Sequence, residues 1–200
     1  MNGLINRALE WLVRDSYGEA LWRGVVEALA LGEAAFEPLM PCEPEVTDRL
    51  LSALAGRIGR APEEILEDLG TYLVSQPRTE AARRLLRFGG LDFVDFLYSL
   101  EDLPDRARLA MPDFTLPEIR LHPGAAGLYR IELGTCPQAG LRLGPVLVGL
   151  LRAMADDYGA LVLLDHRGAD SRGEVIEVRL LDAAFADGRA FDLGAGPVAR

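Results

Sequence analysis

The sequence predicts an α+β fold, in which a helical half precedes a half made of strands and one long helix. Up to about residue 103, apolar residues recur at steps of three and four, as on the buried face of a helix. After residue 117 they alternate with polar residues in short segments, as in half-buried strands. Helices that come first, followed by strands around a single helix, indicate an α+β domain.

Four helices are expected in the N-terminal part. Asp15 and Ser16 offer an N-cap that separates the first two. Pro62 starts the fourth, because proline suits the first helical turn and the acidic residues that follow it complement the positive end of the helix. The expected helices cover residues 2–14, 17–30, 45–58 and 62–73.

A short basic helix at residues 79–87 leads into the most apolar helix of the chain. Residues 91–100 contain only three polar side chains, and a helix that is apolar on nearly every side is expected to be buried. Pro104 has no backbone N–H and disfavours helical geometry at the residue before it, so this helix is expected to end there.

The second half is predicted to consist of strands that surround one helix. That helix is expected at residues 143–158, where the apolar residues return to helical spacing. The polar stretch HRGADSRG at residues 166–173 is expected to be the loop of a hairpin, because its glycines suit a turn. The Gly- and Ala-rich tail from residue 183 onward is expected to be loose. The expected strands cover residues 119–121, 128–133, 161–164 and 174–181.

Composition excludes several classes of function. The chain has 31 acidic and 21 basic residues, and its formal net charge of −10 disfavours nucleic-acid binding. No apolar run approaches the roughly 20 residues that span a membrane, and the N-terminus lacks the basic lead and cleavage site of a signal peptide. Cys42 and Cys136 have no zinc-type spacing and are expected to be reduced, as in a cytoplasmic protein.

No catalytic motif stands out. The sequence has no Gly-x-Ser-x-Gly elbow, no phosphate-binding glycine loop and no His-Glu pair. Adjacent acids such as Asp156 and Asp157 do not share a helix face, so they do not make an acid–base pair. We therefore expect that the protein is not an enzyme.

Three segments together carry a resemblance to a known family. They are MNGLIN at residues 1–6, LGTYL at residues 69–73 and FVDFLYSLEDLP at residues 93–104, the last followed by Pro112 and Pro117. In residue type and spacing they resemble the heme–nitric oxide/oxygen binding (H-NOX) family, the sensor domain of soluble guanylate cyclases and of bacterial signalling proteins.

The resemblance implies a single H-NOX-like domain at residues 1–182, followed by a tail at residues 183–200. A helical subdomain (residues 1–60) would pack on a helix and antiparallel sheet (residues 61–182), with heme between them in the family. The family also implies a bacterial, cytoplasmic domain that signals by conformational change to a separate partner. That partner would be a cyclase, a histidine kinase or a cyclic-dinucleotide enzyme, with no nucleic acid or membrane involved.

Both heme anchors of the family are replaced in this chain. The family's iron-binding histidine follows Leu-acid-x-Leu, where this chain has Pro104, which has no donor atom. The family's Tyr-x-Ser-x-Arg motif, which holds the heme propionates, aligns with Cys136, Gln138 and Gly140, or with Gly134, Cys136 and Gln138 in a shifted register. The resemblance thus implies heme as cofactor, whereas these residues predict a domain that does not bind it in the usual histidine-ligated way.

Substitute iron ligands would have to be Cys136, His122 or Met111, and no metal ligand is assigned. His122 and His166 are expected to have surface or structural roles. Two alternatives stay open: a true nitric oxide or oxygen sensor whose heme has another axial ligand, and a vinyl-reductase-related domain that binds an unknown apolar molecule. The residues expected to line the pocket are Ile5, Trp11, Phe93, Leu97, Leu100, Pro104, Pro117, Cys136 and Gln138.

Overall fold

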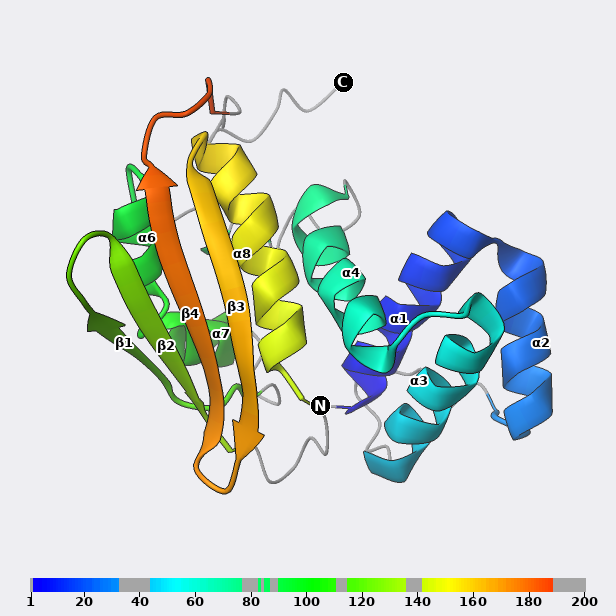
Figure 1. The fold of residues 1–200 in the computed structure, drawn as a ribbon. Coiled ribbons are helices and arrows are strands. Elements are labelled where there is room, and N and C mark those ends of the chain that lie inside the picture. The colour runs from blue at the N-terminus through cyan, green and yellow to red at the C-terminus, as the bar shows by residue number, and fades with distance from the viewer. Residues whose placement is uncertain are drawn as a thin grey trace, which may run out of the picture.

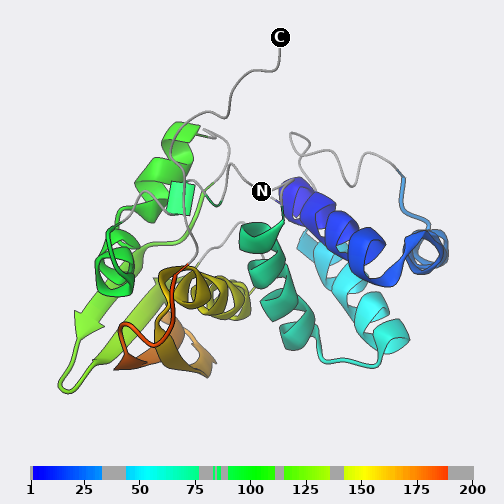
Figure 2. The same cartoon turned by 90° about the horizontal axis from the view of Figure 1, so that it is seen from above.

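The computed structural model describes residues 2–32, 44–76, 83, 85–86, 90–110, 115–135 and 142–188. They form a helical part beside a four-stranded antiparallel sheet that carries helices on one face (Figures 1 and 2). This arrangement confirms the predicted α+β class. The elements are α1 (Asn2–Tyr17), α2 (Glu19–Leu29), α3 (Pro44–Ile58), α4 (Pro62–Ser75), α6 (Phe93–Ser99), α7 (Leu103–Ala110), β1 (Ile119–Pro123), β2 (Leu128–Gly134), α8 (Gly144–Tyr158), β3 (Leu161–Asp170) and β4 (Gly173–Asp182).

Helices α1 to α4 share one apolar core, because each has a buried stripe at helical spacing. Leu9 of α1, Trp22 of α2 and Leu54 of α3 are each at most 2% exposed. α4 joins this core through residues such as Leu69, so it packs with the three helices before it. The division of the domain at residue 60 stays a prediction.

The break between α1 and α2 falls at Gly18 and not at the predicted N-cap. Asp15 and Ser16 both lie inside α1. Gly18 has a φ of 90°, a conformation that glycine adopts without steric cost. The Asp15 carboxylate instead accepts a hydrogen bond from the Tyr72 hydroxyl of α4, at 2.5 Å. The cap prediction was wrong because glycine sets the break and the acid serves a contact that is distant in sequence.

The sheet has the strand order β1-β2-β4-β3, and every neighbouring pair is antiparallel. Its inner face is covered by α8, with α6 and α7 on the same side (Figure 2). The β3–β4 hairpin is longer than expected, since the strands continue to Asp170 and resume at Gly173. The predicted polar loop at residues 166–173 is therefore mostly strand, because the alternation of inward and outward side chains continues through its polar residues.

The apolar helix is shorter than expected and only partly buried. α6 begins after Asp92, whose carboxylate accepts from the Asp95 amide at 2.9 Å, and it ends at Ser99. Pro104 does not end this helix but lies in the first turn of α7, a position that tolerates its missing N–H. Leu91 is 96% exposed and Tyr98 is 48% exposed, so complete burial was a wrong expectation for this segment.

α4 and α8 pack unusually closely, and two glycines make this possible. A methyl group added at Gly70 would overlap the carbonyl oxygen of Val146, and one added at Gly149 would overlap the carbonyl oxygen of Glu67. The Thr71 hydroxyl also donates to the Gly149 carbonyl oxygen at 3.1 Å. Backbone therefore lies against backbone where the helical part meets the sheet part.

Several expectations fall largely outside the described residues. Of the short basic helix at residues 79–87, only Arg83, Leu85 and Leu86 are described, and they are helical. Of the tail, residues 183–188 are described, and the Ala186 amide donates to the carbonyl oxygen of Gly159 at 3.1 Å. In the part of the chain that the structure describes, no helix is long and apolar enough to cross a membrane.

Candidate functional site

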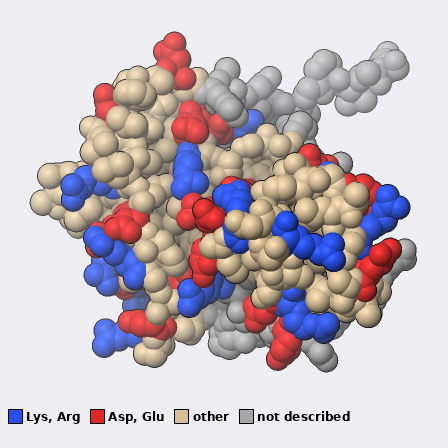
Figure 3. Space-filling view, turned by 45° about the vertical axis from the view of Figure 1, so that its right-hand side comes forward, with Lys and Arg blue, Asp and Glu red and all other residues tan. Residues whose placement is uncertain are grey.

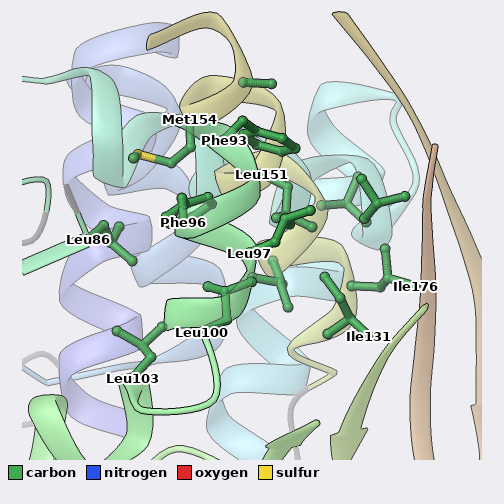
Figure 4. Close-up of a cluster of buried hydrophobic side chains, with 14 of the residues drawn as sticks. Leu86, Phe93, Phe96, Leu97, Leu100, Leu103, Ile131, Leu151, Met154 and Ile176 are labelled. Carbon is green, nitrogen blue, oxygen red and sulfur yellow. The ribbon is translucent and has the colours of Figure 1, made fainter. Parts of the chain in front are cut away.

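α6 and the residue that follows it carry three of the predicted pocket residues into the core of the sheet part. Phe93, Leu97 and Leu100 are each at most 1% exposed, because they recur on the helix face that points toward the sheet. Figure 4 shows them among other buried side chains, including those of Leu151 on α8 and Ile131 on β2. Their surroundings are hydrocarbon, with no charged group among the buried residues of this cluster.

An aromatic group closes one end of this cluster. The rings of Phe93 and Phe96 have centroids 5.8 Å apart, and the ring of Tyr158 on α8 lies 6.4 Å and 5.9 Å from them. The Tyr158 hydroxyl donates to the carbonyl oxygen of Gly90 at 3.1 Å. These contacts fix the start of α6 against the end of α8.

The two predicted pocket residues of α1 lie in the other core. Ile5 is 9% exposed and belongs to the buried cluster of α1–α4, and Trp11 is half-buried against the same cluster. The structure thus groups Ile5 with Trp11, and Phe93 with Leu97 and Leu100, in two separate clusters. That the two groups line one pocket stays a prediction.

The turn that carries Pro104 is fixed by two side chains that the sequence analysis did not single out. The Glu101 carboxylate accepts from the amide of Leu121 on β1 at 2.9 Å. Arg106 of α7 donates to the carbonyl oxygen of Ser99 at 2.8 Å and to that of Leu85 at 3.0 Å. Pro104 itself is half-buried, and Pro117, which precedes β1, is buried. Glu101 belongs to the LEDL motif, but the Leu121 amide that it accepts from lies 20 residues further along the chain. Local sequence patterns do not predict a contact at that separation.

Both histidines lie on the sheet, each beside a carboxylate. His122 of β1 is exposed, with Nε2 3.3 Å from Glu132 Oε2. His166 belongs to β3 and not to the predicted turn, and its Nε2 lies 3.0 Å from Oε2 of Glu174 on β4. Since Leu121 is buried and strand side chains alternate, His122 points away from the core that contains α6.

Three of the predicted residues cannot be placed. Cys136 and Gln138 of the pocket, and Met111 as a substitute ligand, all lie outside the described residues. Within the described ranges, His, Cys, Asp and Glu side chains form no group of three or more that could hold a metal ion. That no metal ligand is assigned stays a prediction.

Charges on the outer face of the sheet are paired with one another. Arg167 lies 3.0 Å from Asp165 and 2.7 Å from Glu177, and this hydrogen-bonded guanidinium lowers the pKa of Glu177. Arg130 lies 3.1 Å from Glu132 in the same way. On the face shown in Figure 3, acidic and basic side chains are interspersed and not gathered by sign. Exposed pairs of this kind are typical of a solvated surface.

Comparison with known families decides the classification. The family model described as Haem-NO-binding matches residues 2–163, most of the chain. The chain belongs to the H-NOX family. No curated protein sequence matches it. H-NOX domains are sensor domains and not enzymes themselves, so the expectation that this chain is not an enzyme is confirmed on the ground of its family.

Solved H-NOX structures share the fold at low sequence identity. The chain is similar to an H-NOX protein from S. oneidensis in the Fe(II) ligation state, with 17% identity, a TM-score of 0.75, and coverage of 92% of this chain and 97% of that one. It is also similar to T. tengcongensis H-NOX, with 14% identity, a TM-score of 0.72, and coverage of 92% and 100%. An oxygen-binding H-NOX domain related to soluble guanylate cyclases gives 14% identity, a TM-score of 0.67, and coverage of 95% and 100%.

The segments that carry the resemblance to the family are placed by this fold. They include the buried face of α6, the LEDL turn and Gly70 of the LGTYL segment, which packs against α8. At the residue after LEDL the side chain is the pyrrolidine ring of Pro104, in the first turn of α7. No lone pair is available there to bind a metal ion.

Proposed function

We propose that this chain is a sensory H-NOX domain that signals by conformational change to a separate partner protein and does not hold heme through a histidine. The observation that carries the proposal is Pro104, which stands after LEDL in the first turn of α7. A heme iron held by protein needs an axial donor atom, and this residue has none. The described residues therefore do not fit a histidine-ligated heme at the position that the family uses.

The geometry of the two histidines supports the same reading. His122 is exposed on the outer face of β1, and His166 is engaged with Glu174 on the sheet. Neither residue belongs to α6 or α7. For His122 to bind a heme iron in the core, the side chains of the edge strand β1 would have to exchange faces. That exchange would expose Leu121, which is buried, to water.

We propose that a change at α6 reaches the helical part through α8. α6 contacts α8 through the rings of Phe93, Phe96 and Tyr158. α8 in turn meets α4 backbone to backbone at Gly70 and Gly149. A displacement of α6 would therefore move α8, and the close crossing would pass that movement to α4, since packed interiors transmit strain.

The remaining assignments follow the family. We propose a bacterial, cytoplasmic protein whose partner is a cyclase, a histidine kinase or a cyclic-dinucleotide enzyme, as in stand-alone H-NOX domains. The domain would cover residues 1–182, with the helical subdomain at 1–60, the helix and sheet at 61–182, and a tail at 183–200. Pocket residues would come from both clusters, with Cys136 and Gln138 at the end where the family holds the propionates.

An absorption spectrum tests the proposal. The protein is purified from cells supplied with a heme precursor, beside a Pro104→His variant and a Pro62→His control. Pro62 lies in the first turn of α4, as Pro104 lies in the first turn of α7, so the control adds an imidazole to a first helical turn away from α6. We expect no Soret band in the unaltered protein or the control, and a band in Pro104→His if the space for heme is preserved.

A Soret band in the unaltered protein would overturn the heme-free proposal and direct the search to Cys136, His122 and Met111. No band in any of the three proteins would favour a filled core or another apolar ligand. Buried side chains in and after α6 support a filled core on the sheet side, since Leu97 and Leu100 are 0% exposed.

A further inference from the structure

The first turn of α8 is capped by a side chain from a strand far away in sequence. Oε1 of Glu174 on β4 accepts from the amides of Leu143 and Gly144, at 2.9 Å and 3.0 Å. The residue is only 9% exposed. The first amides of a helix have no partner within the helix and carry its positive end, so a buried carboxylate is well matched to this position.

His166 of β3 adds a second group to this cap. Its Nε2 lies 3.0 Å from Glu174 Oε2, and the two side chains are 16% and 10% exposed. The alignment is not that of a hydrogen bond, and among the described residues neither of these two buried atoms has a hydrogen-bond partner. Two lone pairs would repel at this distance, so the contact is favourable when His166 carries a proton on Nε2 and Glu174 is ionised.

The helix start is pressed against this pair. A methyl group added at Gly144 would overlap both His166 Nε2 and Glu174 Oε2. The imidazole, the carboxylate and the α8 backbone therefore form one contact, with no room for a side chain between them. A change in the attraction between the two side chains acts directly on the first turn of the helix.

Among the described residues, few other charges face the pair. α8 has no acidic residue in its first turn, and Arg142, which precedes it, lies 3.6 Å from Glu63 of α4. The strand partners of Glu174 are Leu133 on β2 and Ala169 on β3. The strand partner of His166 is Ile176.

Three other charged side chains of the hairpin point the other way. Asp165, Arg167 and Glu177 lie on the outer face of the sheet, where they pair with one another. By sequence, the segment between β2 and α8 (residues 135–143) contributes two groups that can carry charge, Cys136 and the Arg142 already placed beside Glu63. His166 is thus the imidazole that faces Glu174 among the described residues.

We propose that His166 and Glu174 form a pH-responsive latch that holds the N-terminal turn of α8 against the β3–β4 hairpin. Histidine is the side chain whose ordinary titration falls between about pH 5 and 8. When the imidazole is protonated, the carboxylate is held by the cation on one oxygen and by the helix amides on the other. When the imidazole loses its proton, the cationic attraction ends and the carboxylate is held less firmly.

Hydrogen exchange of the Leu143 and Gly144 amides, followed by NMR, tests the latch. Protection factors are measured from roughly pH 5 to 8.5, a range that brackets histidine titration. We expect protection to fall about fivefold as pH rises, the change that corresponds to about 1 kcal/mol for a capping contact. The midpoint should coincide with the titration of the His166 ring. The chain has two histidines, so a His122→Gln variant assigns the ring signals.

Two variants and two controls complete the test. His166→Gln and Glu174→Gln should each remove the pH step, and Glu174→Gln keeps an oxygen that can cap the helix. Glu177→Gln, on the outer face of the same strand, and His122→Gln should each leave the step unchanged. A flat profile in the unaltered protein, or a step that survives His166→Gln or disappears in His122→Gln, would overturn the proposal. The profile of the unaltered protein decides the question even if a variant fails to fold.

Discussion

The α4–α8 crossing gives the sharpest test of the packing argument, through a Gly149→Ala variant. Glycine in a helix interior is ordinarily replaced by alanine with a gain of about 1 kcal/mol, because alanine has less backbone entropy to lose. At Gly149 the new Cβ would overlap the Glu67 carbonyl oxygen and would lie 2.7 Å from the Glu67 carbonyl carbon and 3.0 Å from the Thr71 nitrogen. All three atoms belong to the α4 backbone, so no flexible side chain can move aside.

The magnitude follows from setting these effects against each other. Overpacking a well-filled interior costs about 1–3 kcal/mol, and a rigid backbone neighbour places this site toward the upper end. Separating the helices would also stretch the Thr71–Gly149 hydrogen bond of 3.1 Å, and a bond of this kind contributes about 1 kcal/mol. After subtraction of the helix-propensity gain, we expect a net loss of about 1–3 kcal/mol in the free energy of unfolding.

Urea unfolding followed by circular dichroism measures this loss, with Gly56→Ala as the matched control. Gly56 is an exposed residue inside α3, and a Cβ there would have nothing within 4 Å. The control should gain up to about 1 kcal/mol, since only the propensity term applies. Equal stability of the Gly149→Ala and Gly56→Ala proteins would refute the argument that α4 and α8 meet at their backbones.

Three further predictions concern the end of α6, the turn that follows it and the outer face of the sheet. Leu100→Ala, at a side chain that is 0% exposed, should lower the free energy of unfolding by about 2–5 kcal/mol in urea titrations, and a loss below 1 kcal/mol would contradict the burial. Glu101→Ala removes the acceptor of the Leu121 amide and should speed the exchange of that amide by about fivefold, as expected for a bond of about 1 kcal/mol. Arg167→Gln should raise the pKa of Glu177, which Arg167 lowers, as read by carboxylate carbon NMR. An unchanged Glu177 titration in the variant would rule out this pairing. Because the folded pKa of Glu177 is depressed, its small contribution to stability is present at neutral pH and is lost as pH falls through the folded pKa.

Local signals in the sequence predicted the parts of the fold that depend on near neighbours. α4 begins at Pro62 because proline and acidic residues suit a first helical turn, and α8 follows from apolar spacing over residues 144–158. The four strands were found from alternation, but their lengths were not. β3 continues through Asp165, His166 and Arg167, where polar side chains occupy both faces and the apolar signal ends.

The features that sequence patterns missed all depend on partners distant in the chain. Glu101 bonds to Leu121, and Glu174 bonds to an amide pair 30 and 31 residues away. Neither carboxylate belongs to a local motif that would mark it as a cap. No sequence motif marks Gly149, and the approach of the Glu67 backbone from α4 explains why a glycine is needed there.

These long-range contacts converge on α8, and this has a consequence for how the domain can signal. The helix meets α6 through Tyr158 at its end, α4 through Gly149 in its middle and the hairpin through Gly144 at its start. Each contact is either backbone against backbone or a buried group with a defined partner, so α8 cannot slide freely past any of them. A ligand at α6 and a proton at His166 would therefore act on the same rigid element. If both the exchange experiment and the Gly149 experiment give the expected results, α8 is held at its start and in its middle by contacts within this chain, and none of these contacts needs an iron–histidine bond.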